Sequence, residues 1–253
     1  FSQATSVDFA SDVLAGIEYL KTRKEINPEQ IGLIGHSEGG LIAPMVAVKS
    51  PDVAFIILMA GTGLTGEEIL YLQGALISRA MGVSEEDIAK NRQFNEKIFS
   101  VIKEEKDKKN AEERLRQMFM EDWEKMSDEK KEQIGDPEVF LKAQLQNLLS
   151  PWLKFFLIYD PKPTLSKVKC PVLAINGEKD LQVPPKENLS AIEEALKVGG
   201  NQNYTIKELP NLNHLFQTAQ TGLPAEYAKI EETISPVALK IISDWILEQT
   251  KLK

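Results

Sequence analysis

The sequence predicts an α/β fold, in which a mainly parallel sheet of about four strands is flanked by helices and interrupted by a large helical insertion. Three observations predict this class. Short apolar runs of strand length alternate with amphipathic helical stretches at both ends of the chain. The run at 53–60 is continuously apolar, which is typical of parallel strands buried on both faces. Between them, residues 64–163 contain no strand-like run and are dominated by charged, helix-favouring stretches.

The start of the chain predicts the order helix, strand, helix, strand. From Ser6 to about Arg23, apolar residues recur every three or four positions, which indicates an amphipathic helix. The pair Asn27-Pro28 ends it, because proline pushes the preceding residue out of the helical region. The next expected elements are a buried strand at 31–35, a mostly apolar helix at 39–49 and a second buried strand at 53–60.

The helical insertion ends in an aromatic segment at 151–159. Its aromatic side chains are spaced as i, i+3, i+4 and i+7, so they share one face of a helix. Two interpretations stay open for them, namely packing in the core and forming the wall of an apolar substrate pocket. The residues concerned are Trp152, Phe155, Phe156 and Tyr159.

The alternating pattern returns after the insertion. It predicts a strand at 171–177, a helix at 185–196, a strand at 204–209 and a last helix that opens with Ser235 as N-cap and Pro236. No repeat and no Gly/Ser linker separates two bodies. We therefore expect one α/β core formed by residues 1–63 and 164–253, with residues 64–163 as a helical cap.

Composition excludes several classes of function. Thirty Lys and Arg stand against 38 Asp and Glu, and the resulting net charge of −8 disfavours nucleic acid and anionic membranes as partners. The single cysteine, Cys170, excludes an intrachain disulfide framework and a Cys-based zinc site, and is expected to be a buried structural thiol. Only two histidines are present, which excludes a His-rich metal site. The longest apolar run is strand-sized, so no membrane span is predicted.

A nucleophile motif lies between the first expected strand and the following helix. Residues 35–39 match G-x-S-x-G, a pattern that places its serine on a sharp strand-to-helix turn. Gly35 and Gly39 are expected to permit that turn, and Ser37 to be strained and exposed. The backbone N–H of Glu38 faces the same space and is a candidate oxyanion donor. The alternative for the bare pattern is a glycine-rich turn after a parallel strand.

An acid and a base follow in the required order. His36 lies inside the motif, so His214 is the only distant histidine available as a general base, and it comes just after the last expected strand. Asp180 lies in the turn after the preceding strand, with Glu178 as its substitute. His214 has a structural histidine as its alternative, and Asp180 a surface turn residue or helix cap. The order of the three side chains, each at the carboxyl end of a strand, favours a catalytic triad of Ser37, Asp180 and His214.

With these motifs the sequence resembles the alpha/beta-hydrolase superfamily, and within it bacterial serine esterases of EstD type with a helical cap, also described as S9- or S33-like. The resemblance covers essentially the whole chain. It is carried by the helix at 10–20, the nucleophile turn at 34–43, the return at 159–161, the acid loop at 176–183 and the pair Asn213-His214.

The resemblance implies hydrolysis of carboxylic esters with short acyl chains, on a small-molecule substrate and without metal or organic cofactor. In such enzymes the histidine, here His214, takes the proton of the serine, here Ser37, and an acyl-enzyme forms. Asp180 would hold the imidazole in the required tautomer. Glu38 N–H would be one oxyanion donor.

The main departure from the family lies upstream of Ser37. A complete fold of this kind has several strands before the nucleophile and a second oxyanion donor in an early loop, whereas here only one strand precedes the motif. If the resemblance holds, we expect a partial alpha/beta-hydrolase fold, the C-terminal portion of a longer protein. The strand at 31–34 would then show a bare edge, which predicts a homo-oligomer or pairing with the missing N-terminal segment. Such a chain would be a poor catalyst alone.

Other functions remain open at this point. An aminopeptidase or a thioesterase would use the same triad on another substrate, and a non-catalytic interaction module would keep the fold without the reaction. A nucleotide-binding domain is disfavoured, because Gly61-Thr62-Gly63 lacks the third glycine of a dinucleotide fingerprint. The chain opens at Phe1 without a signal-like segment, so no localisation is predicted.

Overall fold

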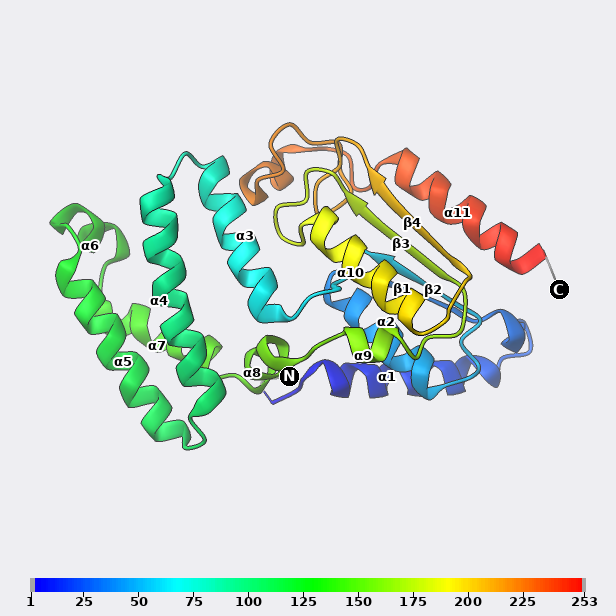
Figure 1. The fold of residues 1–253 in the computed structure, drawn as a ribbon, viewed down its shortest axis with the longest axis horizontal. Coiled ribbons are helices and arrows are strands. Elements are labelled where there is room, and N and C mark those ends of the chain that lie inside the picture. The colour runs from blue at the N-terminus through cyan, green and yellow to red at the C-terminus, as the bar shows by residue number, and fades with distance from the viewer. Residues whose placement is uncertain (1–2, 252–253) are drawn as a thin grey trace.

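The computed structural model describes residues 3–251, so the first two and the last two residues lie outside the described part of the expected core. Its centre is a four-stranded sheet in the order β1-β2-β3-β4, and every neighbouring pair is parallel (Figure 1). The predicted fold class is thereby confirmed. The strands are β1 (Gly32–His36), β2 (Phe55–Met59), β3 (Val172–Gly177) and β4 (Tyr204–Leu209).

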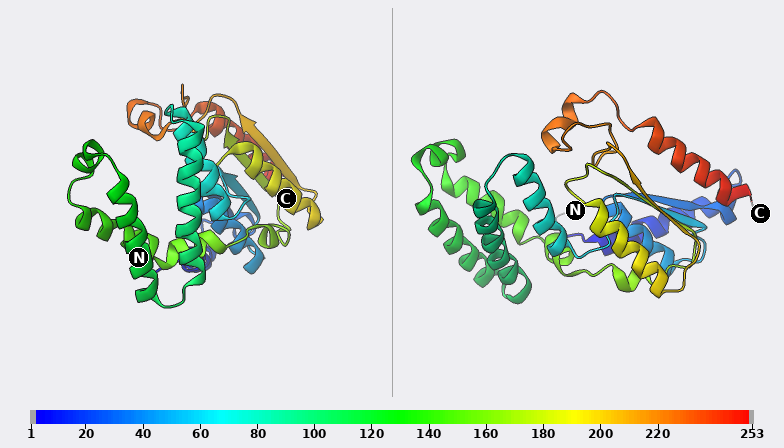
Figure 2. Two further views of the ribbon diagram at one scale, coloured as in Figure 1. Left: turned by 60° about the vertical axis from the view of Figure 1, so that its left-hand side comes forward. Right: turned by 45° about the horizontal axis from the view of Figure 1, so that its top comes forward.

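Helices cover both faces of this sheet. On one face lie α1 (Ser6–Lys21), α2 (Glu38–Lys49), α9 (Lys162–Leu165) and α10 (Pro185–Val198), which enclose one apolar core with the strands. On the opposite face lies α11 (Pro236–Lys251) (Figure 2). It closes a second core, in which Trp245 packs edge-on against Phe55. Burial on both faces explains why β2 is apolar throughout and why every residue of β3 is buried.

A group of helices lies beside the sheet, toward the carboxyl ends of the strands (Figures 1 and 2). It has an apolar core of its own around Phe99, Leu115 and Leu141. This group consists of α3 (Gly66–Ala80), α4 (Glu85–Glu104), α5 (Lys108–Lys125), α6 (Asp128–Ile134), α7 (Pro137–Leu148) and α8 (Pro151–Ile158). Two short 3-10 helices complete the described elements, η1 (Pro28–Gln30) and η2 (Pro224–Lys229).

Local sequence explains where the helices begin. Thr5 and Asp8 form a capping box at α1, and Thr65 and Glu68 form another at α3, so orphan N–H groups of each first turn are satisfied. Ser150 caps α8 by accepting a hydrogen bond from Leu153 N–H. The observed bounds differ from the expected ones by a few residues, because strand ends and helix caps depend on pairing as well as on sequence.

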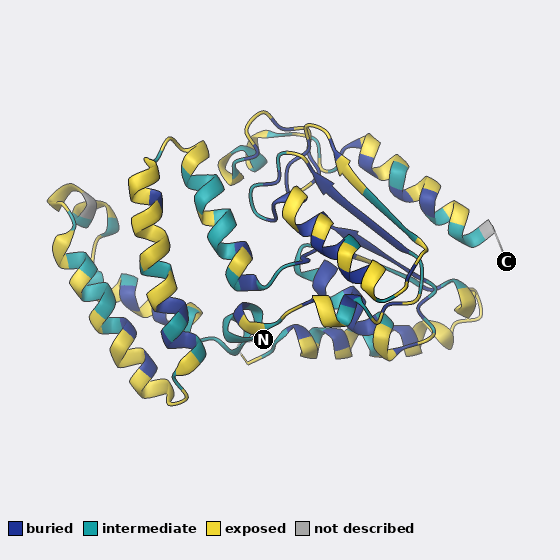
Figure 3. Ribbon diagram, in the orientation of Figure 1, coloured by how far each residue is buried: buried dark blue, intermediate teal, exposed yellow. Residues whose placement is uncertain are grey.

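The sheet is covered unevenly at β1. The strands β2 and β3 are buried along their length (Figure 3). Ile34 in β1 is instead 55% exposed. Ile34 pairs with Ile57, whose side chain packs in the core under α11. The side chain of Ile34 therefore lies on the same face of the sheet, beyond the strands that α11 covers. β1 is also the end of the strand order, so one of its edges is free of a neighbouring strand among residues 3–251.

Candidate active site

Ser37 occupies a strained turn between β1 and α2. Its φ of 54° and ψ of −115° lie on the side of backbone space that residues with a side chain rarely adopt. Two hydrogen bonds hold this conformation. Ser37 N–H donates to the Met59 carbonyl oxygen (2.8 Å), and Gly40 N–H donates to the Ser37 carbonyl oxygen (2.9 Å). The turn thus has the geometry of a nucleophile elbow, with the strain supported by β2 and by the first turn of α2.

The glycines that this turn needs are Gly35 and Gly40. A Cβ at Gly35 would lie 2.0 Å from the Gly39 carbonyl oxygen, and one at Gly40 would lie 2.5 Å from Gly61 Cα. Gly39, expected from the motif to be required, has open space where its Cβ would be. The second steric requirement therefore falls one residue later than expected, because α2 touches the loop after β2 through Gly40.

Asp180 and His214 form a buried pair. His214 Nδ1 lies 2.8 Å from Asp180 Oδ2, and the two residues are 5% and 1% exposed. The other carboxylate oxygen, Oδ1, accepts hydrogen bonds from the N–H groups of Gln182 (2.8 Å) and Val183 (2.9 Å). Because a carboxylate only accepts, His214 carries its proton on Nδ1, which leaves the lone pair of Nε2 available as a base.

The His214 loop is shaped by its neighbour Asn213. The buried Asn213 Oδ1 accepts hydrogen bonds from the N–H groups of Leu215 (3.0 Å) and Gln217 (2.9 Å). Phe216, fully buried, takes a φ of 60° in the same turn. These bonds hold a tight turn that fixes the direction of the imidazole.

Glu178, the substitute acid, has another role. Its Oε2 accepts a hydrogen bond from Asn211 N–H at 2.9 Å, and the residue is exposed. Glu178 thus ties the acid loop to the histidine loop, and the carboxylate that faces His214 is that of Asp180.

His36 connects the nucleophile turn to the histidine loop. Its Nε2–H donates to the His214 carbonyl oxygen at 2.8 Å, and the two imidazole rings lie 4.8 Å apart. Burial lowers the pKa of His36 below its usual 6.5, so the ring is neutral at neutral pH. No role for His36 was predicted from the sequence, where the only relevant signal is its position directly before Ser37.

His36 thus brings the His214 loop to the nucleophile turn, because it is the residue directly before Ser37. Within residues 3–251 Ser37 Oγ makes no hydrogen bond. In a serine hydrolase the bond from the nucleophile to its base is often long before substrate binds. The lack of a Ser37–His214 hydrogen bond among residues 3–251 is therefore compatible with a role of His214 as the base.

The aromatic residues of α8 divide into two pairs. Trp152 stacks on Phe156 with ring centres 5.3 Å apart, and Trp152 Nε1 donates to Glu38 Oε1 at 2.7 Å. Phe155 instead stacks on Tyr159 (5.0 Å), and both pack against the core of the sheet. One pair thus faces the nucleophile turn, whereas the other faces the apolar core.

The Glu38 backbone lies at the first position of α2, where a helix leaves its N–H groups without intrahelical acceptors.

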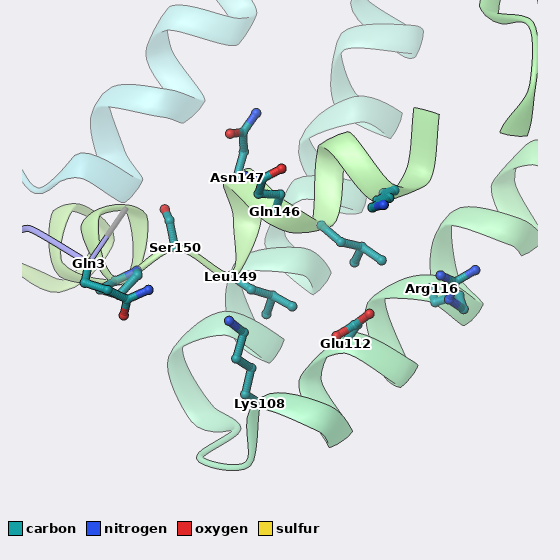
Figure 4. A pocket seen from close by; sticks show the side chains of 11 residues that line it. Gln3, Lys108, Glu112, Arg116, Gln146, Asn147, Leu149 and Ser150 are labelled. Carbon is teal, nitrogen blue, oxygen red and sulfur yellow. The ribbon is translucent and has the colours of Figure 1, made fainter. Parts of the chain in front are cut away.

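A cavity of about 480 Å³ lies elsewhere, between α5, α7 and the start of α8, and is lined by Lys108, Arg116 and Ser150 among others (Figure 4). Ser37 and His214 do not border that cavity.

No group of three or more His, Cys, Asp or Glu side chains in the described part of the chain is placed to hold a metal ion. In that same part, the helices are too short or too polar to cross a bilayer. Cys170 is half-buried, and burial raises the pKa of its thiol to about 11.

Comparison with known proteins adds a family match and a set of similar folds. Residues 14–129, which are fewer than half of the chain, match the family described as BAAT / acyl-CoA thioester hydrolase C terminal. No curated protein matches the sequence. A carboxylesterase structure from the thaumarchaeon Nitrososphaera gargenis aligns with 100% of this chain and 75% of its own, at 18% identity and a TM-score of 0.50.

A second solved structure, dipeptidyl peptidase 4 from Porphyromonas gingivalis, aligns with 98% of this chain and 23% of its own, at 12% identity and a TM-score of 0.51. The chain has the alpha/beta-hydrolase fold. This fold accounts for the places of Ser37 after β1, of Asp180 after β3 and of His214 after β4. Together with the family match it supports a hydrolase.

Proposed function

We propose that this alpha/beta-hydrolase is a serine hydrolase that cleaves carboxylic esters, with Ser37 as nucleophile, His214 as base and Asp180 as acid. The observation that supports this most is the buried Asp180–His214 pair, whose imidazole lies beside the strained Ser37 turn. Ester cleavage agrees with the fold, which this chain shares with a carboxylesterase.

The geometry supports an acyl-enzyme mechanism. His214 Nε2 takes the proton of Ser37 Oγ as that oxygen attacks the ester carbonyl, and Asp180 stabilises the imidazolium that forms. The proton then passes to the alcohol oxygen, whose bond to the acyl carbon breaks. Water repeats the sequence on the acyl-enzyme, giving its proton to His214 and releasing the carboxylic acid as Ser37 recovers its hydrogen.

Glu38 N–H would donate to the oxyanion during both steps. It is the first N–H of α2, next to the nucleophile and at the positive end of the helix dipole. Loss of one such donor costs on the order of 10²- to 10³-fold in rate in serine hydrolases. Because this donor is a backbone group, it is sensitive to the position of the Ser37–Glu38 peptide rather than to the identity of a side chain.

The helical insertion, residues 64–163, would act as a cap over this site, on a core formed by residues 1–63 and 164–253. Trp152 supports this arrangement, because it reaches from α8 to Glu38 in the nucleophile turn. Trp152 and Phe156 would form an apolar wall for the acyl group, and a wall of two rings suits a short acyl chain. Phe155 and Tyr159 would support that wall from the core side.

A thioester is the second candidate substrate, and the family match favours it, because that family is described as containing acyl-CoA thioester hydrolases. The same serine mechanism applies with a thiolate as leaving group. Rates on a p-nitrophenyl ester and on a thioester of the same acyl chain would separate the two substrates, since only the leaving atom differs.

The test of the nucleophile is covalent labelling by a fluorophosphonate, followed by intact mass measurement. One label is expected on the wild-type chain and on Ser11→Ala, an exposed serine of α1 outside the site. No label is expected on Ser37→Ala. Equal labelling of Ser37→Ala would show that another serine reacts and would overturn the proposal.

A further inference from the structure

The side chain of Glu38 joins three elements that are far apart in the sequence. Its Oε1 accepts a hydrogen bond from Ser6 Oγ in α1 and another from Trp152 Nε1 in α8, both at 2.7 Å. Glu38 itself begins α2. The carboxylate is therefore a junction between the core helix α1, the nucleophile turn and the last helix of the insertion.

This junction involves no cation. Within residues 3–251 the two donors to Glu38 Oε1 are the neutral hydroxyl of Ser6 and the neutral indole of Trp152, and no ion pair of Glu38 is formed. A negative charge at this position opposes the negative oxyanion that the proposed reaction creates nearby. A role in geometry therefore explains the carboxylate better than a role for its charge.

The Trp152 end of the junction reports the position of the whole insertion. Trp152 stacks on Phe156, and Phe156 lies against Gly66, where a Cβ would be 2.3 Å from the Phe156 carbonyl oxygen. Gly66 begins α3, the helix by which the chain enters the insertion, and Trp152 lies on α8, the helix by which it leaves. A shift of α3 or of α8 would therefore change the contacts of the Glu38 side chain.

The Glu38 end of the junction bears on the proposed oxyanion donor. The side chain and the N–H belong to one residue, and the peptide that contains this N–H follows the strained Ser37. Two hydrogen bonds on the carboxylate restrict the rotations by which that peptide would relax.

We propose that Glu38 is a positioning residue whose side chain, held by Trp152 and Ser6, couples the helical insertion to the oxyanion donor. The inference rests on the proposed function for its catalytic consequence. The coupling itself is a property of the structure, so it can be measured by an experiment that does not depend on turnover.

The kinetic test compares Trp152→Phe, Glu38→Ala and Glu38→Gln on p-nitrophenyl butyrate. Trp152→Phe keeps an aromatic ring opposite Phe156 and removes the N–H donor together with part of the indole surface. We expect kcat to fall about tenfold, because a group that acts in the transition state lowers kcat and kcat/KM together, and the smaller acyl wall should appear separately as a rise in KM. Glu38→Ala should lose at least as much. Glu38→Gln keeps an acceptor oxygen and should retain most of kcat.

Two further comparisons make the test specific. Trp123→Phe, in α5, is the matched control and should leave kcat unchanged. The double variant Glu38→Ala/Trp152→Phe should be no slower than Glu38→Ala, because both changes break one linkage. Multiplied losses in the double variant, or equal losses in Glu38→Gln and Glu38→Ala, would overturn the proposal.

The readout without turnover is hydrogen exchange at the first turn of α2. Trp152→Phe should speed exchange there relative to Trp123→Phe, with the thermal midpoint of both variants near that of the wild type. Unchanged exchange in Trp152→Phe would overturn the coupling. If Ser37 fails to label while exchange responds as expected, the proposed function has failed and the coupling stands.

Discussion

At the scale of single residues, the site depends on which ring nitrogen of each histidine carries the proton. The Asp180 carboxylate keeps His214 protonated on Nδ1, while the His214 carbonyl oxygen keeps His36 protonated on Nε2. The two rings lie 4.8 Å apart, so a second positive charge on His36 would disfavour the imidazolium of His214. The neutral state of His36 thus favours the proton transfer that the mechanism requires.

Replacing Asp180 by Asn should abolish most activity. An amide can donate to His214 Nδ1 and so favours the tautomer whose Nε2 carries the proton, which removes the base. In a serine protease with the same triad this change lowers kcat about 10⁴-fold, and we expect a loss on the order of 10³-fold or more in kcat/KM on p-nitrophenyl butyrate. Glu178→Gln, in the same loop, is the control and should cost less than about tenfold. Similar losses in both variants would contradict the assignment of Asp180.

The stability of the fold should depend on His36 in mildly acid solution. Burial lowers the folded-state pKa of His36, so the unfolded chain binds the proton more readily than the folded one. The free energy of unfolding should therefore decrease as pH falls from 7 through the unfolded pKa near 6.5. In His36→Gln that part of the pH dependence should disappear. Urea unfolding at pH 7 and pH 5 measures it, and an unchanged difference between the two pH values would refute the prediction.

At the scale of elements, the adjacent glycines Gly39 and Gly40 at the start of α2 differ in the space around them. Gly40→Ala would place a methyl group against the Gly61 backbone and should destabilise the fold by about 1–3 kcal/mol, the usual cost of overpacking. Gly39→Ala meets open space and should be neutral or stabilising by up to about 1 kcal/mol, because alanine favours a helix more than glycine does. Urea unfolding of both variants tests this, and equal destabilisation would contradict the contact through Gly40.

The element pattern was predictable because each strand and helix carries its own periodicity. Runs such as Phe55–Met59 are apolar throughout because both faces of the sheet are covered, and the cap Ser235 stands before Pro236 as expected. The glycine requirement was predicted one residue early, since a motif contains no information on what α2 touches. The division of the aromatic residues of α8 into two pairs was also unpredictable. Periodicity shows which side chains share a helix face, but not which neighbours lie opposite them.

The candidate triad residues could be named from sequence because histidine is so scarce in this chain. The supporting contacts could not. The bond from His36 to the His214 loop and the junction at Glu38 join residues 178 and 114 positions apart. Such contacts follow from the order of the strands and the course of the insertion, neither of which leaves a local signal.

At the scale of the whole molecule, the four strands follow one another in chain order, which leaves β1 at the end of the sheet. Ile34 lies 55% exposed on that strand, on the face that α11 covers only over its neighbours. An exposed apolar edge strand is a template for pairing with another strand. We therefore expect copies of this chain to associate through β1.

A lysine at the edge should prevent this association. In light scattering over a series of concentrations, the wild-type mass should rise toward that of a dimer or higher oligomer, while Ile34→Lys should stay monomeric, because pairing would bury its charge. Val198→Lys is the matched control: it makes the same charge change at a residue that is 78% exposed at the end of α10, far from β1 in the sheet order. It should associate like the wild type. A monomeric wild type, or equal dissociation by both lysines, would show that β1 does not carry the contact.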